Sequence, residues 1–398
     1  MLALMTAGLV PYALVTMMAG GTQRRVDSEV ATNARRSRFT PVSGPSIVLA
    51  PDSKIYKAAA SGLIMPDDVV LEVGCQLGAF TGILAHAARE VIGIDMERSL
   101  DSKSSWGGVY RTHASAAEAG LPENTMLHIA DPRDLLAIQK LCDARGVSVV
   151  CLDANDAVGN DLPLDLLSLC RQLSRVLSPS LRSLLVKSRA LDKLRAQLVT
   201  ASQLMSRAPN ETQWTMPLRS GAPRIVAAMG VAEYRAAAEC FLQPHWRLLE
   251  IGCHKGTSTA RLHALKLAAG GGTGPVAASV GVDVSSSIVE RARAQHPQVT
   301  AFDVADAWDV VGLQRVAARH LQPLASSGQI SEEAGPEMLL LDVGGLSGAH
   351  GELDTLALLR TLTSTFAPSL KVVVVKSHCL RTIALQFQSG YAVAQGRL

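Results

Sequence analysis

The sequence predicts an α/β protein built from two tandem copies of one doubly wound, mostly parallel Rossmann-like domain. Short Val/Ile/Leu-rich runs alternate with amphipathic helical patterns, and several of these runs return later in the chain with the same neighbours. Continuous apolar strands separated by helices are typical of a parallel sheet covered on both faces. We therefore expect residues 45–230 to form a first domain and residues 231–398 a second.

The composition of the 398-residue chain suits large aliphatic cores. Hydrophobic residues make up 48% and charged residues 18%, which excludes collagen-like and disordered classes, and the net charge of +3 indicates no global nucleic-acid surface. Seven cysteines without a Cys-x-x-Cys pair argue against a disulfide framework and a zinc site, so we expect a reducing compartment and no metal. Beyond residue 20 no uncharged apolar run approaches the length of a membrane span, and we expect no insertion of the body.

Residues 1–44 are expected to be a targeting or disordered segment outside the fold. Residues 1–21 carry no charge, and the stretch to Pro41 then holds five arginines, no lysine and only two acidic residues. An Arg-rich, acid-poor stretch is typical of organellar transit peptides, whereas a secretory signal has its positive charges before the apolar stretch. We expect a mitochondrial or chloroplast location and otherwise a cytoplasmic one. A membrane anchor and a disordered extension stay open as alternatives.

Repeated motifs are the evidence for duplication. The sequence VLEVGC at 70–75 returns as LLEIGC at 248–253, and Tyr56-Lys57 returns as Tyr234-Arg235, both at an offset of 178 residues (252 − 74 and 234 − 56). Further along, an aspartate and a lysine 34 residues apart occur in each copy. The length differences fall in Gly- and Ser-rich segments, which surface loops tolerate and core elements do not.

The expected elements follow the same order in each copy. Residues 224–228 are predicted to be the last strand of the first copy, and we expect the final strand pair of the second copy to be missing or shortened. Helices are predicted over ranges such as 164–177 and 353–366. The remaining predicted strands are 68–73, 91–95, 147–152 and 183–187 in the first copy and 247–251, 279–283, 338–342 and 371–376 in the second.

Glycines and acidic residues gather where the predicted strands end. Doubly wound sheets bind ligands at the carboxyl ends of their strands. Glycines there let a ligand approach the backbone, a nearby acid suits an ammonium group, and an acid after the second strand suits ribose hydroxyls. Neither loop has the G-x-G-x-x-G spacing that binds a pyrophosphate, which disfavours an NAD enzyme.

With these motifs, each half resembles a class I S-adenosylmethionine-dependent methyltransferase domain. The family's motif is roughly E/D-x-G-x-G-x-G, followed by an acid after strand two and another acid near the adenine. Gln76 and His254 replace the middle glycine of that motif. The resemblance implies S-adenosylmethionine as the cofactor, with contacts from Glu72, Gly74, Gly78, Asp95 and Asp131 in the first copy and from Glu250, Gly252, Gly256, Asp283 and Asp306 in the second.

Lys57, Asp153 and Lys187 resemble the Lys-Asp-Lys part of FtsJ-like ribose 2′-O-methyltransferases, in which these residue types activate a ribose hydroxyl. The matching residues of the second copy are Arg235, Asp342 and Lys376. An arginine is a poor proton acceptor, so the first copy is the better candidate for chemistry. The last catalytic glutamate of that family has no counterpart, because Pro223-Arg224 occupies the corresponding region.

We therefore expect an S-adenosylmethionine-dependent methyltransferase with RNA as the preferred acceptor, domain 1 as the catalytic copy and an organellar ribonucleoprotein as a candidate partner. Three alternatives stay open. The protein could be a catalytically inactive scaffold or RNA-binding subunit, or it could methylate a small molecule or a protein. The Lys–Asp pairs could also be strand-end salt bridges without a catalytic role.

Overall fold

The computed structural model describes residues 44–75, 78–95, 120–143, 145–153, 162–206, 221–270, 276–323, 334–344, 351–367 and 369–396. The expected targeting segment, apart from its last residue Gly44, and the substituted position Gln76 lie outside the described residues. We refer to residues 44–206 as the first half and to residues 221–396 as the second half. Among the described residues, no helix is both long enough and apolar enough to cross a bilayer.

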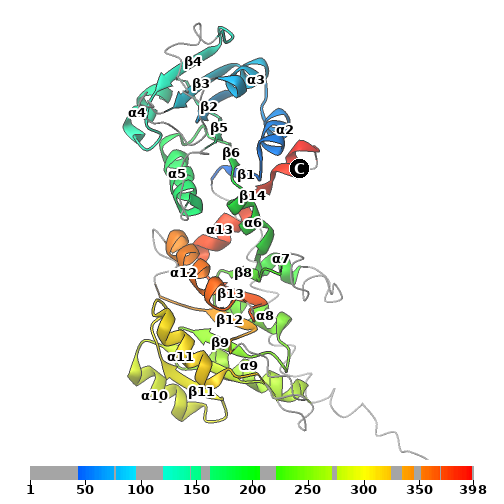
Figure 1. Ribbon diagram of the computed structural model, residues 1–398, viewed down its shortest axis with the longest axis vertical. Helices are drawn as coiled ribbons and strands as arrows, with labels where there is room; N and C mark the ends of the chain where they lie inside the picture. Colours follow the sequence, from blue (N-terminus) through cyan, green and yellow to red (C-terminus); the bar gives the residue numbers. More distant parts are fainter. Residues whose placement is uncertain are drawn as a thin grey trace, which may run out of the picture. The chain divides into compact units, whose positions relative to one another are not determined.

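The first sheet has seven parallel strands in the order β14–β1–β6–β5–β2–β3–β4 (Figure 1). The first half contributes six of them, and its helices connect them. The elements of the first half are β1 (Ser46–Ala50), α2 (Ser53–Leu63), β2 (Val69–Val73), α3 (Ala79–Ala87), β3 (Glu90–Asp95), β4 (Thr125–Ile129), α4 (Leu135–Cys142), β5 (Val149–Leu152), α5 (Leu162–Val176), β6 (Ser183–Lys187), α6 (Arg189–Gln197), β7 (Leu198–Thr200) and α7 (Ala201–Met205), of which β7 lies in the second sheet.

The second sheet also has seven parallel strands, in the order β11–β10–β9–β12–β13–β8–β7. The fold class predicted from the sequence is therefore confirmed. The second half contains β8 (Arg224–Ala228), α8 (Val231–Phe241), β9 (Leu248–Ile251), α9 (Thr257–Ala269), β10 (Ser279–Asp283), α10 (Ser286–Gln295), β11 (Ala301–Val304), α11 (Val310–His320), β12 (Met338–Leu341), α12 (Gly351–Thr365), β13 (Val372–Lys376), α13 (His378–Gln386), β14 (Phe387–Ser389) and α14 (Gly390–Ala394).

The strands form because their side chains are almost all aliphatic and buried. Every residue of β2 is buried, and so are the four valines of β13, as expected for strands with a helical layer on each face. The helices begin at capping residues: Ser188 and Ser377 accept backbone N–H groups at the starts of α6 and α13. One hydrophobic cluster contains residues of both halves, among them Leu173, Leu191 and Leu362.

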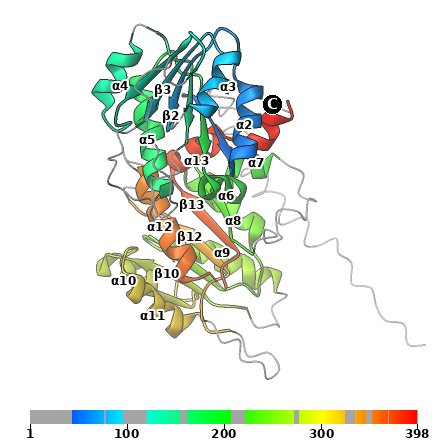
Figure 2. The same ribbon diagram turned by 45° about the horizontal axis from the view of Figure 1, so that its top comes forward.

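The two halves exchange their last strand and helix. β7 of the first half pairs with β8 in the second sheet, and β14 of the second half pairs with β1 in the first sheet. In Figures 1 and 2 the red C-terminal segment accordingly lies beside the blue α2. Each sheet is therefore completed by a strand from the other half.

The exchange places a side chain of each half in the core of the other. Val393 of α14 is 3% exposed and packs in a cluster with Tyr56 and Leu63 of α2. Leu204 of α7 is 7% exposed and packs in the corresponding cluster with Tyr234 of α8. Burial of this kind makes each half depend on the other for part of its hydrophobic stabilisation.

Two expectations about strands are wrong. Residues 224–228 are not the last strand of the first copy: they form β8, which lies in the second sheet between β13 and β7 and matches β1 of the first sheet. The final strand of the second copy is present as β14 and lies in the first sheet. The three-residue strands β7 and β14 are edge strands, which can pair with either sheet, and the apolar pattern of β8 does not show which sheet it joins.

Candidate functional site

The candidate sites lie at the carboxyl ends of the strands, where each first glycine of the loop touches a neighbouring strand end. A Cβ on Gly74 would overlap the backbone carbonyl oxygen of Asp153, and a Cβ on Gly252 would overlap that of Asp342. Both glycines also have a positive φ, 86° and 79° respectively. Only glycine fits these positions, which explains why the motif recurs in both halves.

The second glycine of each loop begins a helix. Gly78 precedes α3 and Gly256 precedes α9, both in the left-handed conformation and without a side-chain cap. The first backbone N–H groups of these helices are therefore directed towards the strand ends, where helix starts favour electron-rich groups. His254 stands at the family's middle glycine and has a φ of 49°, a conformation that is uncommon for residues with a side chain.

The motif acids Glu72 and Glu250 are buried at 1% exposure each. Glu250 accepts hydrogen bonds from the hydroxyls of Tyr234, at 3.1 Å, and Thr259. In the first half the corresponding Tyr56 hydroxyl and the Oε2 oxygen of Glu72 have no hydrogen-bond partner among the described residues. Burial raises the pKa of both glutamates to about 7, so each carboxyl group changes charge near neutral pH.

The acids that follow the second strand of each motif lie beside the glycine loops. Asp95 ends β3 and is 8% exposed. Asp283 ends β10, and its two oxygens accept the backbone N–H groups of His254, at 3.0 Å, and Ser285, at 3.1 Å. Each oxygen keeps acceptor capacity, because a carboxylate has about four lone-pair sites.

The third pair of predicted acids lies in the turns after β4 and β11. Asp131 forms an ion pair with Arg133, and these contacts lower its pKa. Asp306 is exposed and accepts the backbone N–H of Trp308 at 3.0 Å. The structure thus places all five predicted cofactor residues of each half at the same edge of one sheet.

A lysine and an aspartate meet at the ends of the two adjacent strands in each half. Lys187 is the last residue of β6, and its Nζ lies 2.5 Å from Oδ2 of Asp153, which follows β5. The side chains of Lys187 and Asp153 are 8% and 19% exposed. Lys376 and Asp342 form the corresponding ion pair, with exposures of 28% and 23%. The Nζ of Lys187 also donates to Oγ of Ser53, at 3.3 Å, a contact that the sequence analysis did not predict.

The third member of the predicted catalytic set is not joined to the other two. Lys57 is exposed on α2, and no contact among the described residues connects it to Asp153 or Lys187. Arg235, its counterpart, donates to Oγ of Ser258 at 2.9 Å. The structure therefore joins only two of the three predicted catalytic residues directly.

The loop cysteines do not form a nucleophilic site. Burial raises the pKa of Cys75 to about 12 and also raises that of Cys253, so both remain thiols at neutral pH. Over the described ranges, no group of three or more His, Cys, Asp or Glu side chains is arranged to hold a metal ion.

The fold and these strand ends define the chain as a tandem Rossmann-like α/β protein. No protein-family model matches it, and no curated protein matches it. Among solved structures, it is similar to precorrin 8w decarboxylase from Methanobacterium thermoautotrophicum at 20% sequence identity. That match covers 40% of this chain and 74% of the other, with a TM-score of 0.25.

Proposed function

We propose that the protein is an S-adenosylmethionine-dependent methyltransferase and that the first half is the catalytic copy. The observation that carries the proposal is the repeated set of a buried acid, a Gly-x-x-x-Gly loop and a second acid at the carboxyl edge of both sheets. Two copies of this arrangement are less easily explained as a structural turn than one copy would be.

The residues present fit this cofactor. The first glycines bring the loop backbone against the next strand end, because a Cβ at Gly74 or Gly252 would collide with the carbonyl oxygen of Asp153 or Asp342, and the second glycines begin helices whose free N–H groups lie at this edge. The edge is also acidic, which suits a ligand that carries a sulfonium and an ammonium charge. Glu72, Gly74, Gly78, Asp95 and Asp131 would hold it in the first half, and Glu250, Gly252, Gly256, Asp283 and Asp306 in the second. When bound, the cofactor would supply the methyl group.

We propose Lys187 and Asp153 as the residues that act on the methyl acceptor. Their ion pair lies at the same strand edge as the glycine loop, and Lys187 is better buried than Lys376. Burying a charged pair costs desolvation free energy, so such a pair often adds little to the stability of the fold. Its presence at this edge therefore favours a role in the site. Lys187, held by Asp153 and Ser53, would donate a hydrogen bond to the acceptor oxygen, and the carboxylate of Asp153 would take up the proton that a hydroxyl acceptor releases.

RNA is the acceptor class that we propose to test first, because a ribose hydroxyl is the acceptor that a Lys–Asp–Lys set would serve. The exposed position of Lys57, away from the pair, favours a second candidate: methylation of a small molecule or a protein by Lys187 and Asp153 alone. An organellar ribonucleoprotein partner and a mitochondrial or chloroplast location remain predictions.

The test is calorimetric titration of S-adenosylmethionine into the full chain and into Asp95→Ala and Asp283→Ala variants. We expect binding to the wild type, with one site weakened about tenfold or more in each variant, as for the loss of a hydrogen bond to a charged group. Transfer of labelled methyl groups to RNA, protein and small-molecule fractions should then fall in Lys187→Met and persist in Lys376→Met. Absence of any binding by the wild type would overturn the proposal.

A further inference from the structure

The turns that lead from β4 to α4 and from β11 to α11 share one backbone geometry. In the first half Asp134 N donates to Asp131 O at 2.9 Å, and in the second half Asp309 N donates to Asp306 O at 3.1 Å. Both turns are also held to the preceding motif acid, through hydrogen bonds from Ala130 to Asp95 and from Ala305 to Asp283. The side chains of these turns can therefore be compared position by position.

In the first half the turn acid is covered by its neighbour. Nε of Arg133 donates to both oxygens of Asp131, at 2.9 and 3.2 Å, and its NH2 group donates to Oδ2 at 2.8 Å. Both carboxylate oxygens thus face a guanidinium. A ligand that needs Asp131 as an acceptor has to displace Arg133 first.

In the second half the residue at the position of Arg133 is Trp308. Its side chain is 51% exposed, and two exposed valines lie at the ends of the neighbouring strands: Val284, at 69%, directly follows β10, and Val304, at 46%, ends β11. Within the described part of the chain, the carboxylate of Asp306 has only the backbone N–H of Trp308 as a hydrogen-bond partner. The turn therefore presents an indole, two valines and an available carboxylate beside Asp283.

We propose that the second half is the tighter of the two sites for an adenine-type ring, with Trp308 as its stacking surface and Asp306 as the acceptor for its exocyclic amino group. An exposed indole stacks on any planar aromatic ring, and a carboxylate prefers a ring that donates a hydrogen bond. The assignment of that ring to S-adenosylmethionine rests on the proposed function, whereas the preference for an amino-bearing aromatic ring does not.

The first half is the weaker site for two reasons. It offers no aromatic side chain at this turn, and Arg133 occupies both oxygens of Asp131, the acceptor that the ring would need. The ion pair is exposed, with side-chain exposures of 74% and 40%, so it hinders binding without preventing it. A weaker catalytic site in the first half is thus compatible with a tight site in the second.

The test is titration of the full chain with S-adenosylmethionine and, separately, with adenosine, followed by calorimetry and tryptophan fluorescence. Trp308→Arg introduces the residue of the first half and should weaken the tighter site about 10- to 100-fold, as expected for the loss of one stacked ring. Trp308→Phe should stay within about fivefold of the wild type, because the ring is kept. Arg133→Ala should tighten the weaker site about threefold by releasing Asp131. Val311→Ala, at an exposed position on α11, is the matched control and should change neither affinity.

The outcomes separate this inference from the proposed function. One outcome is that adenosine binds, S-adenosylmethionine does not, and Trp308→Arg lowers the affinity for adenosine. In that case the ring site stands and the methyltransferase proposal fails. If S-adenosylmethionine binds and Trp308→Arg has the same affinities as the wild type, the inference is overturned and the proposed function stands. If neither compound binds, both fail. Unchanged far-ultraviolet circular dichroism of Trp308→Arg excludes unfolding as the cause of a loss.

Discussion

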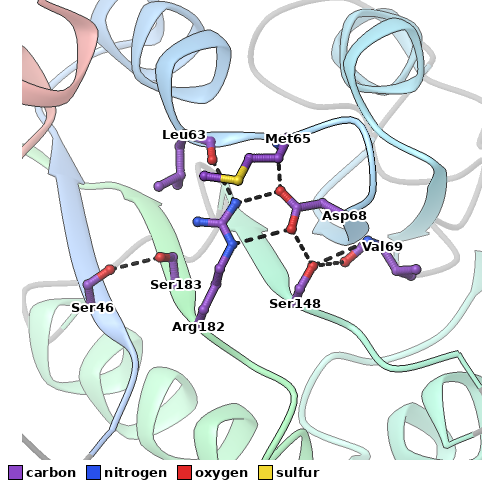
Figure 3. Close-up of polar contacts among 8 residues, drawn as sticks. All are labelled: Ser46, Leu63, Met65, Asp68, Val69, Ser148, Arg182 and Ser183. Atoms are coloured by element: carbon purple, nitrogen blue, oxygen red, sulfur yellow. Dashed lines mark hydrogen bonds and ion pairs between the residues drawn. The ribbon is translucent and has the colours of Figure 1, made fainter. Parts of the chain in front are cut away.

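At the amino ends of the strands, the two halves have different side-chain interactions at matching positions: an ion pair in the first half and a cation–π contact in the second. The first half has an ion pair between Asp68 and Arg182, extended by Ser148 and the carbonyl group of Leu63 (Figure 3). In the second half Trp246 and Lys371 stand at the positions of Asp68 and Arg182, and the Lys371 ammonium lies 5.5 Å from the indole centroid.

The second half has its ion pair one position further along. Arg247 donates to Glu337 through Nε and NH2 and to the carbonyl group of Leu321. Arg247 matches the apolar Val69 of the first half, and Glu337 matches Ser148. Each edge thus has a buried or half-buried charge network, but the residues that form it are not the same.

The carboxyl edges, in contrast, share five identical residues, although other positions such as Arg133 and Trp308 differ. Glu72, Gly74, Asp95, Asp153 and Lys187 all have an identical residue in the second half. At the amino ends of the strands, buried polar groups need only a hydrogen-bond or ion-pair partner, and many residue pairs can supply one. Identical residues at the opposite edge indicate a requirement for particular chemistry, which is why we place the function there.

The largest expected effect concerns the exchanged segments. Val393→Asp places a charge in the core of the first half, and Leu204→Asp does the same in the second half. Each should destabilise the protein by at least about 4 kcal/mol, because an unpaired charge in an apolar core is costly. Hydrogen exchange should show loss of protection in β1 and α2 for Val393→Asp and in β8 and α8 for Leu204→Asp. Loss of protection in the half that contains the substitution would contradict the exchange.

The second prediction compares the two amino edges. Arg182→Met leaves the carboxylate of Asp68, whose side chain is 6% exposed, without its main partner and should cost about 3 kcal/mol. Lys371→Met removes only a cation–π contact and should cost less than about 1 kcal/mol. Urea unfolding at pH 7 measures both, and equal losses would show that the two networks are equivalent.

Lowering the pH should reduce the difference in free energy of unfolding between Arg182→Met and the wild type. Burial alone would raise the pKa of Asp68, but hydrogen bonds from Arg182, Ser148 and the Met65 backbone lower it below 3.8. A group whose pKa is lower in the folded state than in the unfolded state stabilises the fold at pH values above its unfolded-state pKa. This stabilisation is lost as the pH falls through its folded-state pKa. The cost of Arg182→Met should therefore shrink below about pH 4.

A further expected effect tests a feature that the halves share. Burial raises the pKa of Glu72 and Glu250 from 4.5 to about 7, so the folded state binds more protons than the unfolded state between these values. The free energy of unfolding attributable to each group should fall by about 3 kcal/mol as the pH rises from about 4.5 to 7. Glu72→Gln and Glu250→Gln should each flatten this dependence in unfolding measured from pH 5 to 8. A variant with the pH profile of the wild type would show that its glutamate is already charged throughout.

The duplication and the site positions could be predicted from local sequence. Nine strands and the glycine loops follow from apolar runs and the steric freedom of glycine, whereas β1, β4, β7, β11 and β14 were not predicted. The pairing of Lys187 with Asp153 was also predictable, because the carboxyl ends of adjacent parallel strands meet at one edge. The contact of Ser53 with Lys187 was not, because it joins elements distant in the chain, and the exposure of Trp308 was not, because the repeated motif that contains it does not show which side chains are buried.

By itself, the sequence determined the fold class, the duplication and which residues stand at the carboxyl edge, because these depend on side-chain patterns within a few residues of one another. Only the tertiary structure decided which sheet receives β7 and β14, that β8 belongs to the second sheet, and that Arg133 covers Asp131. A three-residue strand forms the same backbone hydrogen bonds in either sheet. Its partner is selected by side chains distant in the chain, such as the cluster around Tyr56 that receives Val393.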